Sequence, residues 1–179
     1  MSLALKNKGF DVYACDLIPE IFCVDDVPIE SVNLNEGLSQ YPDNFFDYAI
    51  CLEVLEHVEN HFLVFKEIYR ILKPGGLFIL STPNISHIQS RILFLLFGFF
   101  AGFKPNDYPL GHINPIYPVF LKNMLKDAGF TNINLDYNRG WLYYGFSHNT
   151  LLADKGLEIP IKNSLWGQIL IASAVKRQF

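Results

Sequence analysis

The sequence predicts a single α/β domain, built on a mostly parallel sheet with helices on both faces. Three observations lead to this fold class. Short, continuous apolar runs alternate with amphipathic segments whose apolar residues recur at helical spacing. Prolines and glycines stand between these segments, where strands and helices are expected to stop. Two apolar runs also come late and close together, which predicts an antiparallel edge formed by the C-terminal strands.

The first part of the chain is expected to hold three strands. A helix ends near Lys8, and the apolar run Phe10–Leu17 predicts a buried strand that carries Asp16 at its carboxyl end. Ser31–Leu34 is a candidate short strand. Phe45–Leu52 is a second strong strand, because it follows a Pro-Asp-Asn turn, and Glu53–Val58 is a short helical segment.

The middle of the chain predicts two helices around a strand. His61–Leu72 has apolar residues at helical spacing and stops at Lys73-Pro74-Gly75-Gly76. Leu77–Ser81 is a buried strand that ends before Pro83. Ile85–Phe103 is expected to be helical and is unusually apolar throughout.

The last part predicts a helix and two strands. Tyr117–Ala128 is amphipathic and closed by Gly129, and Phe130–Tyr137 follows as a strand. A loop-rich stretch separates it from a final strand at Gly167–Val175. All 179 residues therefore form one domain, with a core of ordinary size for this length.

Composition excludes several classes of protein. Half of the residues are apolar and 18% are charged, so the chain is neither disordered nor a coiled coil. A net charge of −4 without a basic run argues against binding duplex nucleic acid. Cys15, Cys23 and Cys51 show no metal-ligand spacing and are expected to be reduced thiols, which indicates a cytoplasmic protein. Ile92–Phe103 is too short to cross a bilayer.

A resemblance to a known family rests on several motifs in order. The first motif is Tyr41-Pro-Asp-Asn-Phe-Phe-Asp47, which leads directly into the second, Asp47-Tyr-Ala-Ile-Cys-Leu-Glu-Val-Leu-Glu-His-Val58. The third motif is Ile71-Leu-Lys-Pro-Gly-Gly-Leu-Phe78. Together they resemble the class I S-adenosylmethionine-dependent methyltransferases, above all the small-molecule and ubiquinone-type O-methyltransferases. Gly111–Asn114 and Lys126–Phe130 match later segments of that family. The resemblance covers about Gly9 to Tyr137.

The resemblance implies a Rossmann-like sheet and methyl transfer from S-adenosyl-L-methionine to a small or lipid-like acceptor, most simply at oxygen. The family begins with a strand and a glycine-rich loop, whereas no two glycines here stand one residue apart. The chain is thus expected to be N-terminally truncated relative to the family, which leaves the strand ending at Asp16 without a neighbour. A non-catalytic binding or scaffold protein of the same fold is the alternative. A dehydrogenase is disfavoured, because the G-x-G-x-x-G loop is absent.

Candidate cofactor residues lie where strands end, since ligands of open α/β sheets bind there. By resemblance, Asp16 and the adjacent Leu17 lie at the ribose, Asn33 and Leu34 flank the adenine, and the methionine end follows Cys51, Leu52 and Glu53. A carboxylate suits a ribose diol, because both hydroxyls can donate to it. Asp16 could instead be a helix cap or an ordinary turn residue.

A metal site and a catalytic base are predicted nearby. Glu53, Glu56 and His57 have i, i+3, i+4 spacing and would share one face of a helix, where they could hold a divalent cation such as Mg²⁺. His112 could add a ligand, or could act as the base that deprotonates an acceptor hydroxyl, with His57 as a second catalytic candidate. Alternatively, His57 only orients the loop and the glutamates are solvated.

An acceptor-binding lid is predicted at about residues 85–116. Its apolar part, residues 92–103, carries more phenylalanine than one core stripe needs. It could line an apolar acceptor pocket, rest on a membrane surface or form a homodimer contact, and a buried core helix is an equally good interpretation.

Overall fold

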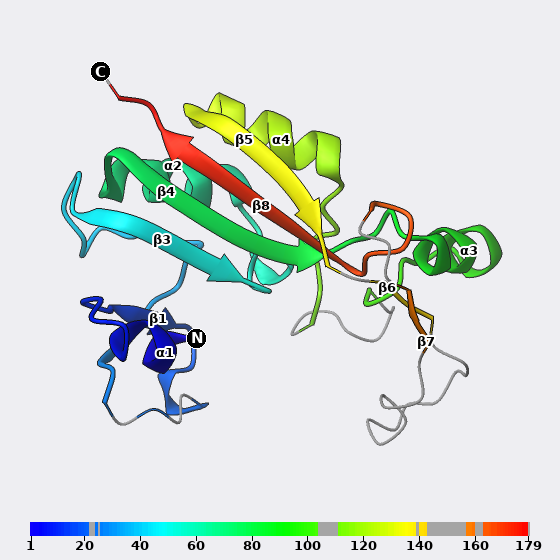
Figure 1. Cartoon of the computed structure of the whole chain (residues 1–179), viewed down its shortest axis with the longest axis horizontal. Helices are drawn as coiled ribbons and strands as arrows, with labels where there is room; N and C mark the ends of the chain where they lie inside the picture. Colours follow the sequence, from blue (N-terminus) through cyan, green and yellow to red (C-terminus); the bar gives the residue numbers. More distant parts are fainter. Residues whose placement is uncertain are drawn as a thin grey trace.

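A computed structural model describes residues 1–21, 24, 26–103, 111–138, 140–142, 157–159 and 163–178. Helices and strands alternate along most of this chain (Figure 1). Their order is α1 (Ser2–Lys6), β1 (Ala14–Asp16), the 3₁₀ helix η1 (Pro19–Ile21), β2 (Ile29–Ser31), β3 (Phe46–Leu52), the 3₁₀ helix η2 (Leu55–His57), α2 (His61–Ile71), β4 (Leu72–Pro83), α3 (Ile88–Phe97), α4 (Pro118–Asp127), β5 (Phe130–Tyr137), β6 (Gly140–Leu142), β7 (Leu157–Ile159) and β8 (Ile169–Lys176).

The main sheet has four strands in the order β3-β4-β8-β5. β3 and β4 are parallel, with Cys51 opposite Leu80. β8 is antiparallel to both β4 and β5, so β3, β4 and β5 all run in one direction. The antiparallel pairing expected of the two C-terminal strands is confirmed, although β8 lies inside the sheet between β4 and β5 rather than at its edge.

Two smaller sheets complete the described strands. β1 and β2 pair in parallel, with Ala14 opposite Ile29 and Asp16 opposite Ser31. Among the described residues, no strand pairing joins this pair to the four-stranded sheet. β6 and β7 form an antiparallel pair in the stretch that sequence patterning assigned to loops.

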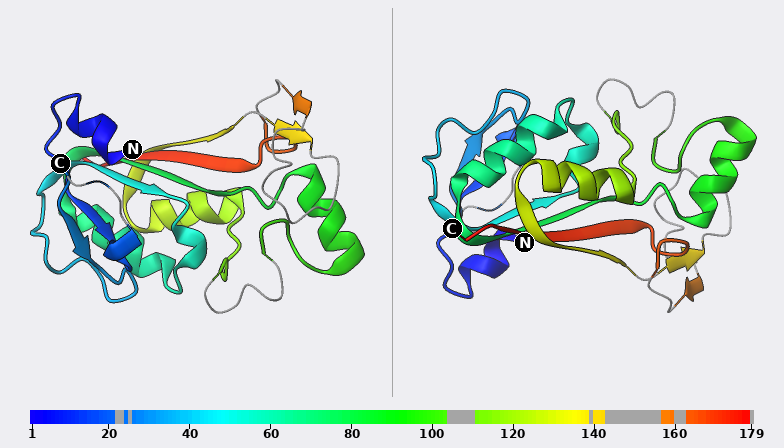
Figure 2. Two further views of the ribbon diagram at one scale, coloured as in Figure 1. Left: turned by 90° about the horizontal axis from the view of Figure 1, so that it is seen from below. Right: turned by 90° about the horizontal axis from the view of Figure 1, so that it is seen from above.

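The core lies between the main sheet and two helices on one of its faces. α2 and α4 pack together on that face, and α1 lies on the other side (Figure 2). Side chains from α2, α4 and the sheet are fully buried there, among them Phe65, Phe78, Leu80, Leu121 and Leu125. No residue of α1 is buried. The alternating burial along β8 shows that one face of each inner strand carries the core.

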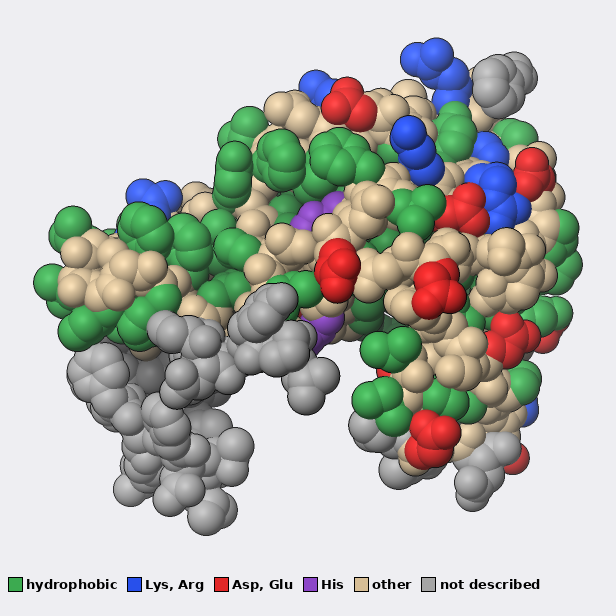
Figure 3. All heavy atoms as spheres, turned by 180° about the vertical axis from the view of Figure 1, so that it is seen from behind, with side chains coloured by type: hydrophobic (Ala, Val, Ile, Leu, Met, Phe, Trp, Pro, Cys, Tyr) green, Lys and Arg blue, Asp and Glu red, His purple; other side chains and the backbone are tan. Residues whose placement is uncertain are grey.

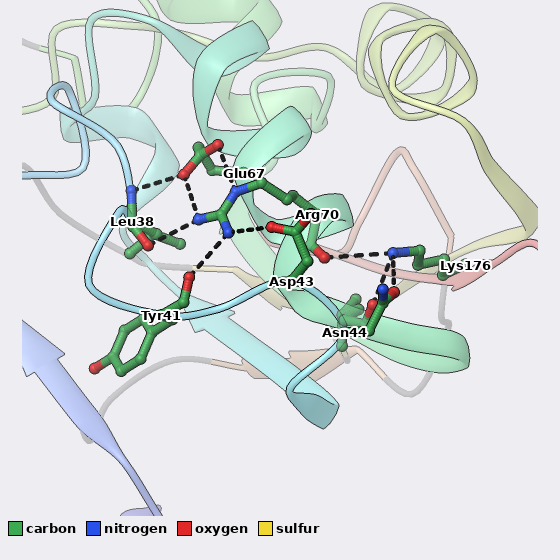
Figure 4. Close-up of polar contacts among 8 residues, drawn as sticks. Leu38, Tyr41, Asp43, Asn44, Glu67, Arg70 and Lys176 are labelled. Atoms are coloured by element: carbon green, nitrogen blue, oxygen red, sulfur yellow. Dashed lines mark hydrogen bonds and ion pairs between the residues drawn. The ribbon is translucent and has the colours of Figure 1, made fainter.

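A polar network ties the end of α2 to the loop before β3 (Figure 4). Arg70 donates from Nη1 to the Tyr41 carbonyl and from Nη2 to the Leu38 carbonyl, each at 2.9 Å. Its Nε donates to Glu67 Oε1 at 3.0 Å, and Glu67 Oε2 accepts from the Leu38 amide at 3.0 Å. One guanidinium therefore fixes the course of the chain from β2 to β3.

Several predicted boundaries differ from those of the structure. The strand expected at Phe10–Leu17 covers only Ala14–Asp16 and is largely exposed, because its pairing with β2 extends over three residues. The helix expected at Ile85–Phe103 covers Ile88–Phe97 alone: His87 caps its start and Gly98 ends it in a left-handed conformation. In contrast, Phe130–Tyr137 is a strand with the predicted bounds.

Candidate active site

The candidate site begins where β3 ends, beside β4. Glu53 follows the last residue of β3 and has a positive φ of 52°, which turns the chain sharply toward η2. Its backbone amide donates to the Ser81 carbonyl at 3.1 Å, and its carboxylate accepts from Ser81 Oγ at 2.5 Å. β4 therefore holds both the backbone and the side chain of Glu53.

Glu56 is the buried acid of the site. Its side chain has no exposed surface, and Oε2 accepts a hydrogen bond from Thr82 Oγ1 at 3.2 Å. Oε1 accepts no hydrogen bond among the described residues and lies 3.9 Å from His112 Nε2. Burial is the main reason why the pKa of Glu56 is raised, and the nearby charge of Glu53 raises it further.

Two histidines stand against each other beside this acid. The rings of His57 and His112 meet edge to face, with centroids 4.8 Å apart. His57 Nδ1 is 3.0 Å from the Gly111 carbonyl, which can only accept, so Nδ1 carries a proton and donates this hydrogen bond. His57 is exposed and His112 is partly exposed, so both are accessible to a ligand.

Residues 111–114 are held against η2 by backbone hydrogen bonds. The amides of Ile113 and Asn114 donate to the Glu56 carbonyl at 2.9 and 3.0 Å. Asn114 Nδ2 donates to the Val58 carbonyl at 2.6 Å. These bonds bring His112 to the end of β3 from more than fifty residues along the chain.

The structure groups Glu56, His57 and His112 as a set of ligands. One ligand atom from each lies within 4.8 Å of the other two. The predicted set was Glu53, Glu56 and His57, on the assumption of one continuous helix. η2 begins only at Leu55, so Glu53 lies outside it and is hydrogen-bonded to Ser81 instead. His112, which was predicted as a possible further ligand, therefore lies with Glu56 and His57, whereas Glu53 does not.

The predicted cofactor residues lie at three strand ends. Asp16 ends β1 and accepts a hydrogen bond from the Ile18 amide, which is the turn role given as its alternative. Asn33 and Leu34 follow β2. The Asn33 side chain is engaged locally, since its oxygen accepts from the Asn35 amide and its nitrogen donates to Glu36. Leu17 is exposed, whereas Leu34 packs against the core.

Cys51 and Leu52 end β3, where one is buried and the other exposed. Burial raises the pKa of the Cys51 thiol to about 12, so it remains neutral. Cys51 is therefore a core residue whose backbone, rather than its sulfur, is available to the site. Cys15 is also a free thiol, and Cys23 lies outside the described residues.

Sequence patterning missed three polar residues that hold the site together. Thr82 bonds Glu56, Ser81 bonds Glu53, and Asn114 anchors the His112 loop. A signal existed for the first two, because hydroxyl residues at the end of a buried strand need partners. Asn114 lies in the Gly111–Asn114 segment that matches the family. The spacing of residues along the sequence does not predict its hydrogen bond to the Val58 carbonyl.

α3 extends apolar side chains into solvent at one end of the molecule. Leu95 is 83% exposed, and Ile92, Phe94, Leu96 and Phe97 are also exposed. Figure 3 shows hydrophobic side chains gathered at the end of the molecule where α3 lies. The buried core helix offered as one interpretation is therefore wrong for this segment. Residues 104–110 of the expected lid lie outside the described residues. No described helix is long and apolar enough to span a membrane.

A cavity of about 470 Å³ lies at the other end of the main sheet. It is lined by Tyr69, Lys126, Gly129, Phe130, Thr131 and Arg177. Phe130 begins β5, so this cavity adjoins the amino ends of the parallel strands, away from Glu53 and Glu56. Ligands of open α/β sheets bind at the carboxyl ends, so the candidate site remains the one beside β3.

Comparison with known proteins gives related sequences. The methyltransferase domain model Methyltransf_23 matches residues 1–135. The ubiquinone biosynthesis O-methyltransferase of Psychrobacter arcticus is 30% identical over 171 residues, covering 86% of this chain and 66% of that protein. A protein of the same description from Xanthomonas campestris is 34% identical over 95 residues, covering 47% of this chain and 38% of that protein. The chain thus spans less than two thirds of the length of either relative.

Solved structures share the fold at lower identity. A SAM-dependent methyltransferase from Archaeoglobus fulgidus superposes with a TM-score of 0.69 at 19% identity, covering 97% of this chain and 80% of that one. A SAM-dependent methyltransferase from Methanosarcina mazei superposes with a TM-score of 0.64 at 19% identity. The match covers 100% of this chain and 88% of that one. These likenesses concern the fold. The match over residues 1–135 shows that this protein belongs to the methyltransferase domain family, and the solved structures show that it has the fold of the S-adenosylmethionine-dependent methyltransferases.

Proposed function

We propose that this chain transfers a methyl group from S-adenosyl-L-methionine to a hydroxyl oxygen of a small or lipid-like acceptor. The observation that carries the proposal is the convergence of Glu56, His57 and His112 directly beyond the carboxyl end of β3. The relatives described as ubiquinone biosynthesis O-methyltransferases support oxygen as the methylated atom and an acceptor related to ubiquinone.

The reaction needs alignment and a place for one proton. When bound, S-adenosyl-L-methionine would supply the methyl group, and an acceptor oxygen would take it as S-adenosylhomocysteine leaves. The acceptor proton passes to a base. His112 Nε2, close to the buried Glu56 carboxylate, suits this role because the acid stabilises the imidazolium that forms. His57 orients the pair through its bond to Gly111.

The cofactor would lie along the strand ends between β1 and β3. Asp16 is proposed for the ribose, Leu34 for the adenine, and the Cys51–Glu53 backbone for the methionine end. Asn33 would act through its backbone, since its side chain is engaged by Asn35 and Glu36. Glu53 stays available to the cofactor through the oxygen that does not bond Ser81.

The same three residues also fit a divalent metal ion. A buried Glu56 oxygen without a hydrogen bond is an orphaned acceptor of the kind that a cation satisfies. One carboxylate with two imidazoles suits Mn²⁺, Fe²⁺ or Zn²⁺ better than Mg²⁺, which prefers oxygen ligands. When bound, the ion would lower the pKa of an acceptor hydroxyl. Glu56, His57 and His112 would hold it.

The decisive experiment measures methyl transfer from labelled S-adenosyl-L-methionine to a catechol, an alkylated catechol and phosphoethanolamine. We expect transfer to the catechols alone. His112→Gln and Glu56→Gln should lower kcat by roughly 100-fold or more, in keeping with loss of a general base. Glu59→Gln, an exposed acid two residues from His57, is the matched control. Transfer to the amine, or full activity in His112→Gln, would contradict the proposal.

Removal of metal ions by a chelator distinguishes the two proposed roles of Glu56, His57 and His112, which are metal binding and general-base catalysis by His112. Loss of activity in EDTA, with recovery by Mn²⁺ or Zn²⁺ rather than Mg²⁺, would assign Glu56, His57 and His112 to a metal. Activity that persists in EDTA and falls with protonation of a histidine would assign His112 as the base. Binding of S-adenosyl-L-methionine without transfer to any of these acceptors would favour the non-catalytic alternative.

A further inference from the structure

The cavity at the amino ends of the parallel strands brings together two cationic side chains from distant parts of the chain. Its volume of about 470 Å³ is within the range of small-molecule sites, roughly 300–1,000 Å³. Lys126 lines it from the last turn of α4, and Arg177 lines it from the position after β8. The register of β5 and β8 places Phe130 opposite Lys176, so the end of β8 lies beside the beginning of β5 (Figure 1).

No acidic side chain balances the charges of Lys126 and Arg177. Among the residues that the structure describes, neither cation forms an ion pair, not even with the adjacent Asp127. No Asp or Glu lines the cavity either. The dipole of α4 favours a cation at Lys126, but Arg177 belongs to no helix. Because like charges repel each other, a bound anion would stabilise this arrangement.

A third cation lies behind the wall of the same cavity. Lys176 Nζ is 4.8 Å from the centre of the Tyr69 ring, and Tyr69 lines the cavity. The hydrogen bonds of this ammonium go to Asn44 Oδ1 and to the carbonyls of Arg70 and Leu72, which are all neutral acceptors. Since Lys176 is buried, salt and water screen its charge less than that of an exposed lysine. Its charge therefore adds to the attraction for an anion.

The wall of the cavity combines a hydroxyl group with an aromatic surface. Gly129 lies directly against the hydroxyl end of Tyr69, because a Cβ atom on Gly129 would come within 3.0 Å of Tyr69 Cζ and 3.3 Å of Oη. Within the described part of the chain, the Tyr69 hydroxyl forms no hydrogen bond, so it is available to donate to a ligand. Phe130 packs edge to face on the Tyr69 ring, with centroids 5.1 Å apart. Thr131 Oγ1 already donates to the Val175 carbonyl.

We propose that this cavity binds a phosphate group, either as free phosphate or as the monoester of a small organic molecule. A phosphate dianion matches several cations at once, and the Arg177 guanidinium can donate two parallel hydrogen bonds to its oxygens. Lys126 supplies a point charge, and Tyr69 supplies a hydrogen bond from its hydroxyl. The ring of Tyr69 offers a contact for the organic part of a monoester. This site lies away from Glu53 and Glu56, and it does not depend on the proposed function.

Isothermal titration calorimetry of the 179-residue chain provides the test. The probes are inorganic phosphate and phenyl phosphate at constant ionic strength, at about pH 7.5, where the phosphate group is mostly a dianion. Benzoate, a monoanion with a similar ring, is the control. We expect a Kd for phenyl phosphate of roughly 1 mM or lower, and at least about tenfold weaker binding of benzoate. Tighter binding of phenyl phosphate than of phosphate would assign the site to an organic monoester, and equal binding would assign it to free phosphate.

Matched variants locate the binding in this cavity. Lys126→Gln and Arg177→Gln should each weaken phenyl phosphate binding by about tenfold, because each removes a charged donor, and Tyr69→Phe should weaken it by about threefold. Both cations are exposed, so their variants should keep the native circular dichroism spectrum. Lys8→Gln makes the same change of net charge at an exposed residue after α1 and should preserve binding. His112→Gln, in the candidate active site, should also preserve it.

Four results would overturn the proposal. The first is no binding of either phosphate compound at millimolar concentration, and the second is equal binding of benzoate and phenyl phosphate. The third is unchanged binding in the double variant Lys126→Gln/Arg177→Gln, or an equal loss in Lys8→Gln, which would indicate general attraction to a charged surface. The fourth is loss of binding in His112→Gln, which would place the phosphate compound in the candidate active site instead.

Discussion

Lys176 places a cationic group inside the protein at the end of β8. It is 6% exposed, and Nζ donates to the Leu72 carbonyl at 2.8 Å and to Asn44 Oδ1 at 2.9 Å. The Tyr69 ring lies 4.8 Å from the same nitrogen. Burial lowers the pKa of this ammonium. Lys176 therefore links β8 to the point where α2 passes into β4.

Removal of this ammonium should destabilise the fold. Lys176→Met keeps the apolar stem but leaves the Leu72 carbonyl and Asn44 without a donor, and we expect it to lower the free energy of unfolding by about 1–3 kcal/mol. Urea unfolding followed by circular dichroism measures this change. Lys122→Met, on the exposed side of α4, is the control and should be nearly neutral. An equal loss in both variants would show that the contacts of Lys176 contribute nothing particular.

Glu67 should make the free energy of unfolding depend on pH in the acidic range. Hydrogen bonds from Arg70 are the main reason why its pKa is lowered, and the Leu38 amide adds to them. Because the folded state holds the carboxylate more strongly than the unfolded state, its contribution is complete above the unfolded pKa and is lost as pH falls through the folded value. The stability advantage of the native chain over Glu67→Gln should therefore shrink below about pH 4.5, the ordinary value for glutamate. Urea unfolding at pH 7, 5 and 3.5 tests it, and a constant difference would contradict it.

At the level of elements, strand and helix types were predictable where local pattern and tertiary neighbours agree. Phe130–Tyr137 and the start of α2 at His61 follow from periodicity and their caps, since Asn60 Oδ1 accepts from the Leu63 amide. The length of β1 was overestimated because β2, its one partner among the described strands, pairs with it over three residues only. The position of Glu53 could not be predicted, because its left-handed backbone depends on bonds to Ser81. His112 was identified from its motif, but its pairing with Glu56 depends on the docking of residues 111–114.

The exposed apolar side chains of α3 support the proposal that the acceptor or its surroundings are lipid-like. Leu95 and Leu96 are among the most exposed apolar residues of the described chain, and the interior of a bilayer interface would bury them. The double variant Leu95→Gln/Leu96→Gln should bind less to phosphatidylglycerol vesicles in sedimentation assays and should keep native stability. Val119→Gln, an exposed apolar residue of α4, is the control. Equal vesicle binding by all three proteins would remove this role from α3, and a change of oligomeric state would assign α3 to a dimer contact.

At the level of the whole molecule, the β1–β2 sheet and the four-stranded main sheet should differ in local stability. β1 and β2 offer few backbone partners, whereas β4 and β8 lie inside the main sheet with neighbours on both sides. We therefore expect the amides of Ala14–Asp16 and Ile29–Ser31 to exchange much faster than those of Ile169–Lys176, because local opening requires fewer contacts to break. Native-state hydrogen exchange by mass spectrometry measures the difference. Equal protection in both regions would mean that aromatic contacts between the two sheets make them one cooperative unit. These contacts join Phe10 to Tyr48 and Tyr13 to Phe45 and Phe46.

The position of β8 has a consequence for how the protein is made. This strand is the last one that the structure describes, yet it lies between β4 and β5 and contributes Leu170, Ala172 and Ala174 to the core. During synthesis, β4 and β5 leave the ribosome before β8. Until β8 is made, neither strand has the neighbour that joins them. Until residue 176 leaves the exit tunnel, the nascent chain exposes two unsatisfied strand edges, and chaperones that bind such edges have their longest opportunity at that stage.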